Sequence, residues 1–122
     1  MRAFPKYLLL ALLMAGIACG ASAHALLDKA EPAVGSEVAP GPTELRLHFT
    51  EGVEIRFSGV EISGADGKAV VPVKLASDPA NPAIVMVTLP SALAPGGYKV
   101  SWHVVSVDTH KTQGTYTFTV KR

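Results

Sequence analysis

The pattern of apolar and polar positions predicts an all-β protein. Residues 44–50 alternate strictly, so that Leu45, Leu47 and Phe49 face one side of an extended chain while charged side chains and His48 face the other. The same period of two recurs later in the chain, in residues 98–104 and 116–120. Because each such run has one apolar face, each predicts a strand that covers a shared core.

Several shorter runs complete the set of expected strands. Residues 26–31 form a first strand that ends at Pro32, and residues 84–89 are apolar on both faces, which is typical of a central strand. The apolar positions at residues 53–57 and 60–62 predict a strand with a bulge at Ser58 and Gly59, where the pattern changes face. Residues 70–75 contain Pro72 and therefore predict an edge strand.

Eleven glycines and nine prolines separate these runs, and the residues 65–68 read as a tight hairpin turn. No run shows a capped apolar stripe with the helical period. About seven short strands at this spacing predict a single Greek-key β-sandwich, with Trp102 in its core.

The first 23 residues have the three parts of a secretory signal peptide. Arg2 and Lys6 give a positive start, an apolar run follows, and Ala21-Ser22-Ala23 is a typical cleavage site. The apolar run is too short to span a bilayer. We therefore expect residues 1–23 to be removed and residues 24–122 to be exported and to fold as one domain in an oxidising compartment, with no membrane-spanning segment after cleavage.

The single cysteine allows one alternative and excludes one class of site. Cys19 would be a lipidation site only in a lipobox, and Gly16 stands where that motif has Leu. With one cysteine the chain has neither an internal disulfide nor a cysteine-based zinc cluster.

The net charge and the motifs of the chain exclude several other functions. A net charge of +1 does not favour nucleic-acid binding, and the sequence motifs of common hydrolases and dehydrogenases are absent.

Cleavage after Ala23 would leave His24 as the first residue, which is chemically unusual. Its free amine and its ring Nδ1 can close a six-membered chelate on one metal ion. Nitrogen donors of this kind suit Cu(II), which binds such sites more tightly than the other divalent first-row transition metals do. The alternative is that a histidine is merely tolerated after the cleavage site.

A second group of donors lies at Asp108 and His110. Residues two apart in extended chain point the same way, so a carboxylate and an imidazole can converge on one ion. Together with His24 they would supply three nitrogens and an oxygen, a tetragonal set that favours Cu(II) over zinc. Glu51 follows a strand end and is a candidate outer or weak ligand. We expect His48 and His103 to lie on outward strand faces.

These residues resemble the CopC family of periplasmic copper-resistance proteins. The resemblance extends over the chain after residue 23, and three features carry it: His24, residues 47–53 with the sequence LHFTEGV, and the pair GYKVSW and VSVDTH at residues 97–102 and 105–110.

The resemblance implies an immunoglobulin-like sandwich that binds one Cu(II) through His24, Asp108 and His110, with Glu51 near the site. It implies a role in copper sequestration, delivery, resistance and homeostasis rather than catalysis, and a possible partnership with the inner-membrane protein CopD. Some members also carry a methionine-rich Cu(I) segment. The corresponding residues 63–68 contain no methionine, and Met86, the only methionine after residue 23, falls in an apolar strand. We therefore expect a Cu(II) site alone. We also expect the protein to be a monomer.

Two other functions remain open. An N-terminal histidine also resembles that of the lytic polysaccharide monooxygenases, so a small copper-dependent oxidase is one alternative. Most of the aromatic residues after residue 23 fall on core-facing positions, which disfavours the flat aromatic surface of those enzymes. The other alternative is an immunoglobulin-like interaction module that needs no metal.

Overall fold

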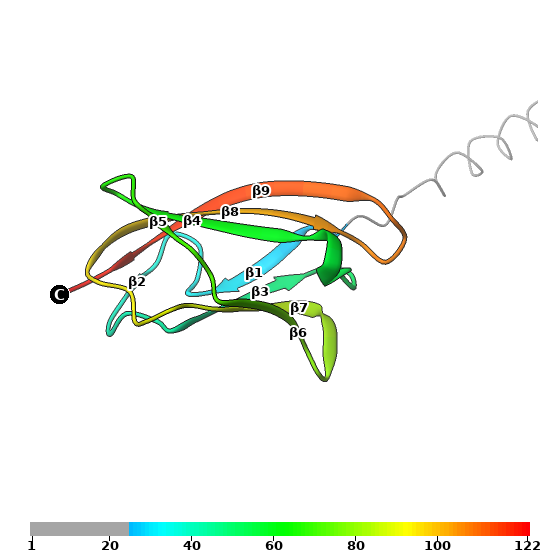
Figure 1. Cartoon of the computed structure of the whole chain (residues 1–122), viewed down its shortest axis with the longest axis horizontal. Coiled ribbons are helices and arrows are strands. Elements are labelled where there is room, and N and C mark those ends of the chain that lie inside the picture. Colours follow the sequence, from blue (N-terminus) through cyan, green and yellow to red (C-terminus); the bar gives the residue numbers. More distant parts are fainter. Residues whose placement is uncertain (1–24) are drawn as a thin grey trace, which may run out of the picture.

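The structure, a computed structural model, describes residues 25–122 as two packed, mainly antiparallel sheets (Figure 1). The first sheet has the order β1-β3-β7-β6, formed by Leu27–Glu31, Glu44–Phe49, Asn81–Thr88 and Lys74–Asp78. The second has the order β2-β9-β8-β4-β5, formed by Glu37–Val38, Lys111–Val120, Gly96–Val105, Gly59–Gly64 and Ala69–Val70. The short β2 runs parallel to β9. The expected β-sandwich is confirmed, with nine strands in the described residues, two of which have two residues each.

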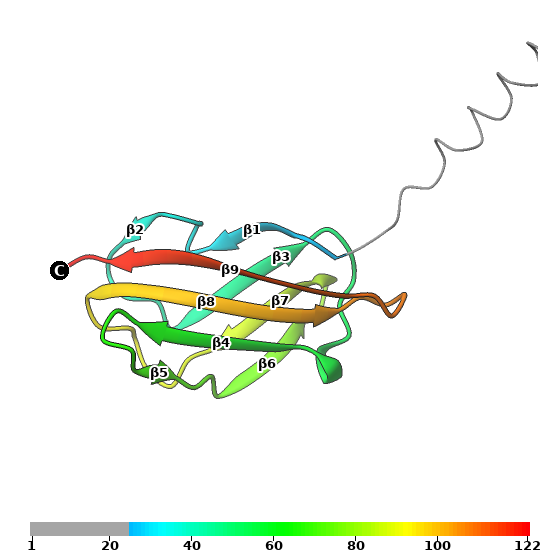
Figure 2. The ribbon, with the colours of Figure 1, turned by 90° about the horizontal axis from the view of Figure 1, so that it is seen from above.

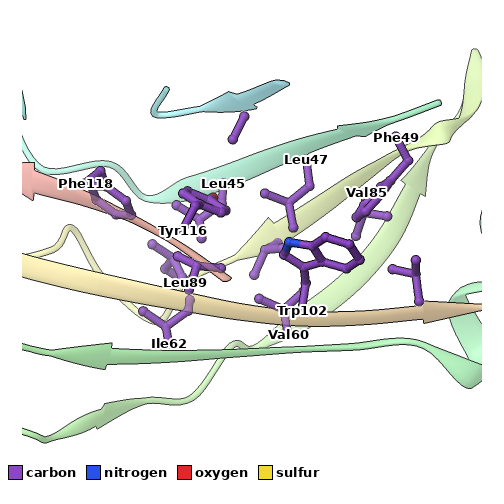
Figure 3. Close-up of a cluster of buried hydrophobic side chains, with 14 of the residues drawn as sticks. Leu45, Leu47, Phe49, Val60, Ile62, Val85, Leu89, Trp102, Tyr116 and Phe118 are labelled. Atoms are coloured by element: carbon purple, nitrogen blue, oxygen red, sulfur yellow. The ribbon is translucent and has the colours of Figure 1, made fainter. Parts of the chain in front are cut away.

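The core lies between the sheets and follows the alternation of the sequence. Leu45 and Leu47 of β3 are fully buried, and Trp102 of β8 faces them across the sandwich (Figure 3). Val100 of the same strand is also fully buried. The rings of Phe49 and Trp102 meet edge to face, with their centroids 5.1 Å apart. Such a pair adds about 0.5–1.5 kcal/mol beyond the burial of its area. The predicted place of Trp102 in the core is therefore confirmed.

Gly114 makes room for the indole ring of Trp102. The two residues are paired between β8 and β9, and a Cβ atom at position 114 would lie 2.6 Å from Cζ2 of Trp102. Any larger residue at position 114 would displace the largest side chain of the core. The glycine is thus required by a close approach within the sandwich.

Two sequence predictions about strands are wrong. Residues 53–57 do not form a strand: Val53 makes an isolated bridge to Ser106, and Ile55–Phe57 form a short 3-10 helix, η1. Residues 70–75 do not form one strand either, because the chain leaves β5 of one sheet and enters β6 of the other on either side of Pro72. Proline lacks the amide hydrogen that a continued ladder requires, so the crossing occurs there.

Both β5 and β6 lie at sheet edges, and β7 lies between β3 and β6, as its two apolar faces predicted. The residues 65–68 form the expected turn between β4 and β5, with Gly67 at φ +82°. Among residues 25–122, no helix is long and apolar enough to cross a bilayer.

Candidate metal centre

The connection between β8 and β9 carries two of the predicted donors. The chain leaves β8 at Val105 and enters β9 at Lys111, so residues 106–110 form a tight turn at one end of the sandwich (Figure 2). The Ser106 amide donates to the His110 carbonyl at 2.9 Å, and the Thr109 amide donates to the Ser106 carbonyl at 2.8 Å. Thr109 has φ 72°, a left-handed conformation that closes the turn.

Asp108 and His110 meet across this turn. Their side chains are 37% and 51% exposed, and Oδ2 of Asp108 lies 3.2 Å from Nδ1 of His110. The prediction that the two side chains converge is confirmed, but its reason was wrong. A turn with a left-handed residue at position 109, rather than extended chain, brings the carboxylate and the imidazole together.

The Ser106 hydroxyl is hydrogen-bonded to both of these residues. Ser106 is the one buried polar residue of the described chain, with no exposed surface. Its hydroxyl donates a hydrogen bond to Oδ1 of Asp108 and accepts one from the His110 amide at 3.2 Å. The donation from Ser106 lowers the pKa of Asp108 below its ordinary value. Burial opposes this with a smaller effect than that of Ser106, and the His110 ring adds to the lowering. The carboxylate is therefore ionised at neutral pH and available as an oxygen donor.

The segment after β3 packs beside this turn. The Val107 amide donates to the Gly52 carbonyl at 3.1 Å, and the Glu54 amide donates to the Val105 carbonyl at 2.8 Å. Glu51 precedes this contact and is half-buried. Within residues 25–122, no three side chains of the types His, Cys, Asp and Glu gather closely enough to hold a metal ion. Glu51 is therefore not a third member of the Asp108 and His110 pair, and its outer role stays a prediction.

The start of the described chain lies at the same end of the sandwich. The Thr112 hydroxyl, two residues beyond His110, donates to the Ala25 carbonyl at 2.6 Å. The Leu26 amide donates to the Thr50 hydroxyl at 3.0 Å. His24, the remaining predicted ligand, lies outside the described residues. The fit of the donors can thus be judged from Asp108 and His110, whose oxygen and nitrogen atoms suit Cu(II) or zinc.

The other two histidines lie on outer sheet faces, as predicted. Nε2 of His48 lies 2.9 Å from a carboxylate oxygen of Glu31 on the neighbouring strand β1. The exposed His103 packs across Gly59 of β4, where an added Cβ would lie 2.4 Å from the imidazole. The structure brings neither histidine to the β8–β9 turn.

Comparison with known proteins identifies the family of this chain. Residues 27–121 match the CopC domain. The chain belongs to the CopC family. Protein YobA of Escherichia coli strain K12 is 42% identical to it over 99 residues, which are 81% of this chain and 80% of that protein.

Two solved structures of the family superpose on the sandwich. CopC from Methylosinus trichosporium OB3b is 34% identical, with a TM-score of 0.73 over 80% of this chain and 94% of its own. PcoC from Escherichia coli, described as a methionine-rich copper resistance protein, is 36% identical, with a TM-score of 0.72 over 81% of this chain and all of its own. The fold expected from the family resemblance is thus confirmed.

Sequence reasoning missed Ser106 and Thr112 as contributors to this end of the sandwich. Ser106 lies inside the VSVDTH stretch, so its place two residues before Asp108 was a usable signal. Thr112 carries no such signal, because threonines are frequent in β9 and only the packed structure shows which one reaches Ala25.

Proposed function

We propose that this chain is a periplasmic Cu(II)-binding protein that sequesters or delivers copper and has no catalytic activity. Membership of the CopC family supports a copper-related role, as does the likeness to a copper resistance protein of Escherichia coli. The proposed signal segment, residues 1–23, supports export to the periplasm, where copper delivery to an inner-membrane protein such as CopD is the proposed next step.

The observation that carries this proposal is the preformed pair of Asp108 and His110 on the turn braced by Ser106. A carboxylate 3.2 Å from an imidazole supplies an oxygen and a nitrogen donor without any rearrangement of the backbone. Ala25 is fixed to Thr112, two residues beyond His110. His24 precedes Ala25, so its amine and its ring nitrogen are the proposed remaining donors for one Cu(II) per chain.

The donor chemistry favours Cu(II) over Cu(I). Nitrogen and carboxylate donors suit Cu(II), whereas Cu(I) prefers thiolate and thioether sulfur. Met86 is the only methionine among residues 25–122, and its Sδ lies 3.6 Å from the Arg46 guanidinium. A cation beside the sulfur disfavours binding of a second cation there.

The free amine of His24 is the sharpest test of the proposal. A chain that begins at His24 should bind Cu(II) stoichiometrically, whereas the same chain with four glycines added before His24 should lose affinity by orders of magnitude. The extension converts the amine of His24 into an amide, and the new terminal amine is too far along the chain to form a short chelate with the ring. Competition against a chromophoric chelator measures both affinities. His103→Ala is the matched control, because it removes an exposed histidine from the outer face of β8 and should leave affinity unchanged.

The same titration at lower pH should show weaker binding and release of protons. The amine and the imidazole have ordinary pKa values of about 7.7–8.0 and 6.5, so copper must displace protons from them near neutral pH. Asp108 cannot produce this trend, because donation from Ser106 holds its pKa below the ordinary carboxylate range. Equal Cu(II) affinity with and without the four added glycines would overturn the proposed site.

A further inference from the structure

The chain is held by side chains just before β1 begins. Ala25 is fully buried, although it precedes the first strand. Its carbonyl accepts a hydrogen bond from the Thr112 hydroxyl at 2.6 Å. The next residue, Leu26, is paired with Thr50 twice, through its amide to the Thr50 hydroxyl at 3.0 Å and through its carbonyl to the Thr50 amide at 2.9 Å.

The two threonine hydroxyls come from different sheets. Thr50 follows directly after β3 of the four-stranded sheet, and Thr112 is the second residue of β9 in the five-stranded sheet. β1 itself pairs with β3, and the register of that pairing shifts between Leu27 and Lys29. The Thr112 hydroxyl therefore adds a link from Ala25 to the sheet that carries the β8–β9 turn.

This link is short along the chain as well as in space. Thr112 lies two residues after His110, and the backbone between them continues into the β8–β9 pairing, where Val104 is paired with Thr112. A hydrogen bond from Thr112 to Ala25 thus fixes the residue after His24 relative to the residue that carries the other imidazole.

We propose that Thr50 and Thr112, the threonine clamp, are positioning residues for Cu(II) binding, because they fix Ala25 and Leu26, directly after His24, beside the turn that carries His110. The inference rests on the proposed function and adds to it the contacts that hold the start of the described chain before copper binds. Terminal residues of a domain are poorly ordered unless something ties them down, and ordering them only on binding reduces affinity. The clamp orders Ala25 and Leu26 before copper binds and so removes their share of that cost.

Thr112→Val tests the clamp, because valine keeps the shape of threonine and removes the hydroxyl. Cu(II) affinity should fall about fivefold, the loss expected for one net hydrogen bond. Thr112→Ser retains the hydroxyl and should restore the affinity. Thr117→Val, an exposed position on the same strand, is the matched control and should bind as the parent chain does.

The electron paramagnetic resonance spectrum supplies a readout that a purely structural role would not change. Looser placement of the amine should alter the copper hyperfine pattern of Thr112→Val, whereas Thr112→Ser and Thr117→Val should keep the parent spectrum. If Thr112→Val does not fold, Thr50→Val carries the same expectation from the other sheet.

Parent affinity and an unchanged spectrum in both Thr112→Val and Thr50→Val would overturn the clamp. The glycine-extended chain separates this failure from failure of the site itself. If the extension abolishes binding while the threonine variants bind normally, the site stands and the clamp does not. If the extension has no effect, the proposed site is wrong as well.

Discussion

The two ends of the sandwich use their polar groups differently. At the β8–β9 end, a buried serine braces an aspartate and a histidine, and two threonines tie down the start of the described chain. At the opposite end, the β4–β5 turn and the loop before β8 border an open hollow of about 800 Å³. Its lining includes Val70, Pro90, Leu93 and Tyr98. No histidine, cysteine or methionine is found among the residues that line it in the described part of the chain.

The difference shows that the volume of a hollow does not indicate whether its residues can bind a metal ion. Two charged side chains, Asp66 and Lys68, line the hollow. The Tyr98 hydroxyl, which also lines it, donates to the nearby Ala94 carbonyl at 2.6 Å. The β8–β9 turn does not border this hollow, but it brings an oxygen and a nitrogen atom to within 3.2 Å of each other. A metal ion needs the second arrangement, because its binding energy comes from a few donor atoms at fixed distances.

The largest effect should come from the ligands of the β8–β9 turn. His110→Ala should weaken Cu(II) binding by at least about 100-fold, because imidazole nitrogen is a stronger donor for Cu(II) than carboxylate oxygen. Asp108→Ala should have a smaller effect, measured by the same chelator competition. A greater loss from Asp108→Ala than from His110→Ala would show that the assignment of the two roles is reversed.

An intermediate effect should come from the residue beneath the ligands. Ser106→Ala removes the hydroxyl that contacts Asp108 and the His110 amide, and should weaken Cu(II) binding by about tenfold, as is common for groups that orient a metal ligand. A double-mutant cycle with Asp108→Ala measures how much of this passes through the carboxylate. Full additivity of the two substitutions would contradict a role of Ser106 in orienting Asp108.

The smallest effect on copper should come from the opposite end. Tyr98→Phe removes the hydrogen bond to the Ala94 carbonyl and should lower the free energy of unfolding by about 0.5 kcal/mol, since the bond is exposed. Cu(II) affinity should not change. Denaturant unfolding and copper titration of the same variant measure the two quantities, and a loss of copper affinity would mean that the two ends are not independent.

The sequence was most informative where one property depends on local pattern. The alternation at residues 44–50 placed Leu45, Leu47 and Phe49 in the core, because a strand has only two faces and one of them must be apolar to be buried. The same reasoning was wrong at residues 53–57. Three apolar side chains at alternate positions also fit a bridge followed by one turn of 3-10 helix, and a pattern this short does not distinguish the two.

Part of the candidate site could also be predicted from the sequence. Residue chemistry and family resemblance indicated Asp108 and His110, and the structure brings those two together. Their geometry was not accessible, because it depends on the left-handed Thr109 and on the buried Ser106 hydroxyl, and neither follows from the spacing of the two donors.

By itself the sequence determined the all-β class, the faces of the long strands and the types of donor atom the chain can offer. Only the tertiary structure decided which hydroxyls support those donors, because the contact from Thr112 to Ala25 joins residues 87 positions apart. Likewise it decided that β5 and β6 belong to different sheets on either side of Pro72. Strand alternation is a local consequence of backbone geometry, whereas contacts between sheets depend on how two surfaces pack after both have formed.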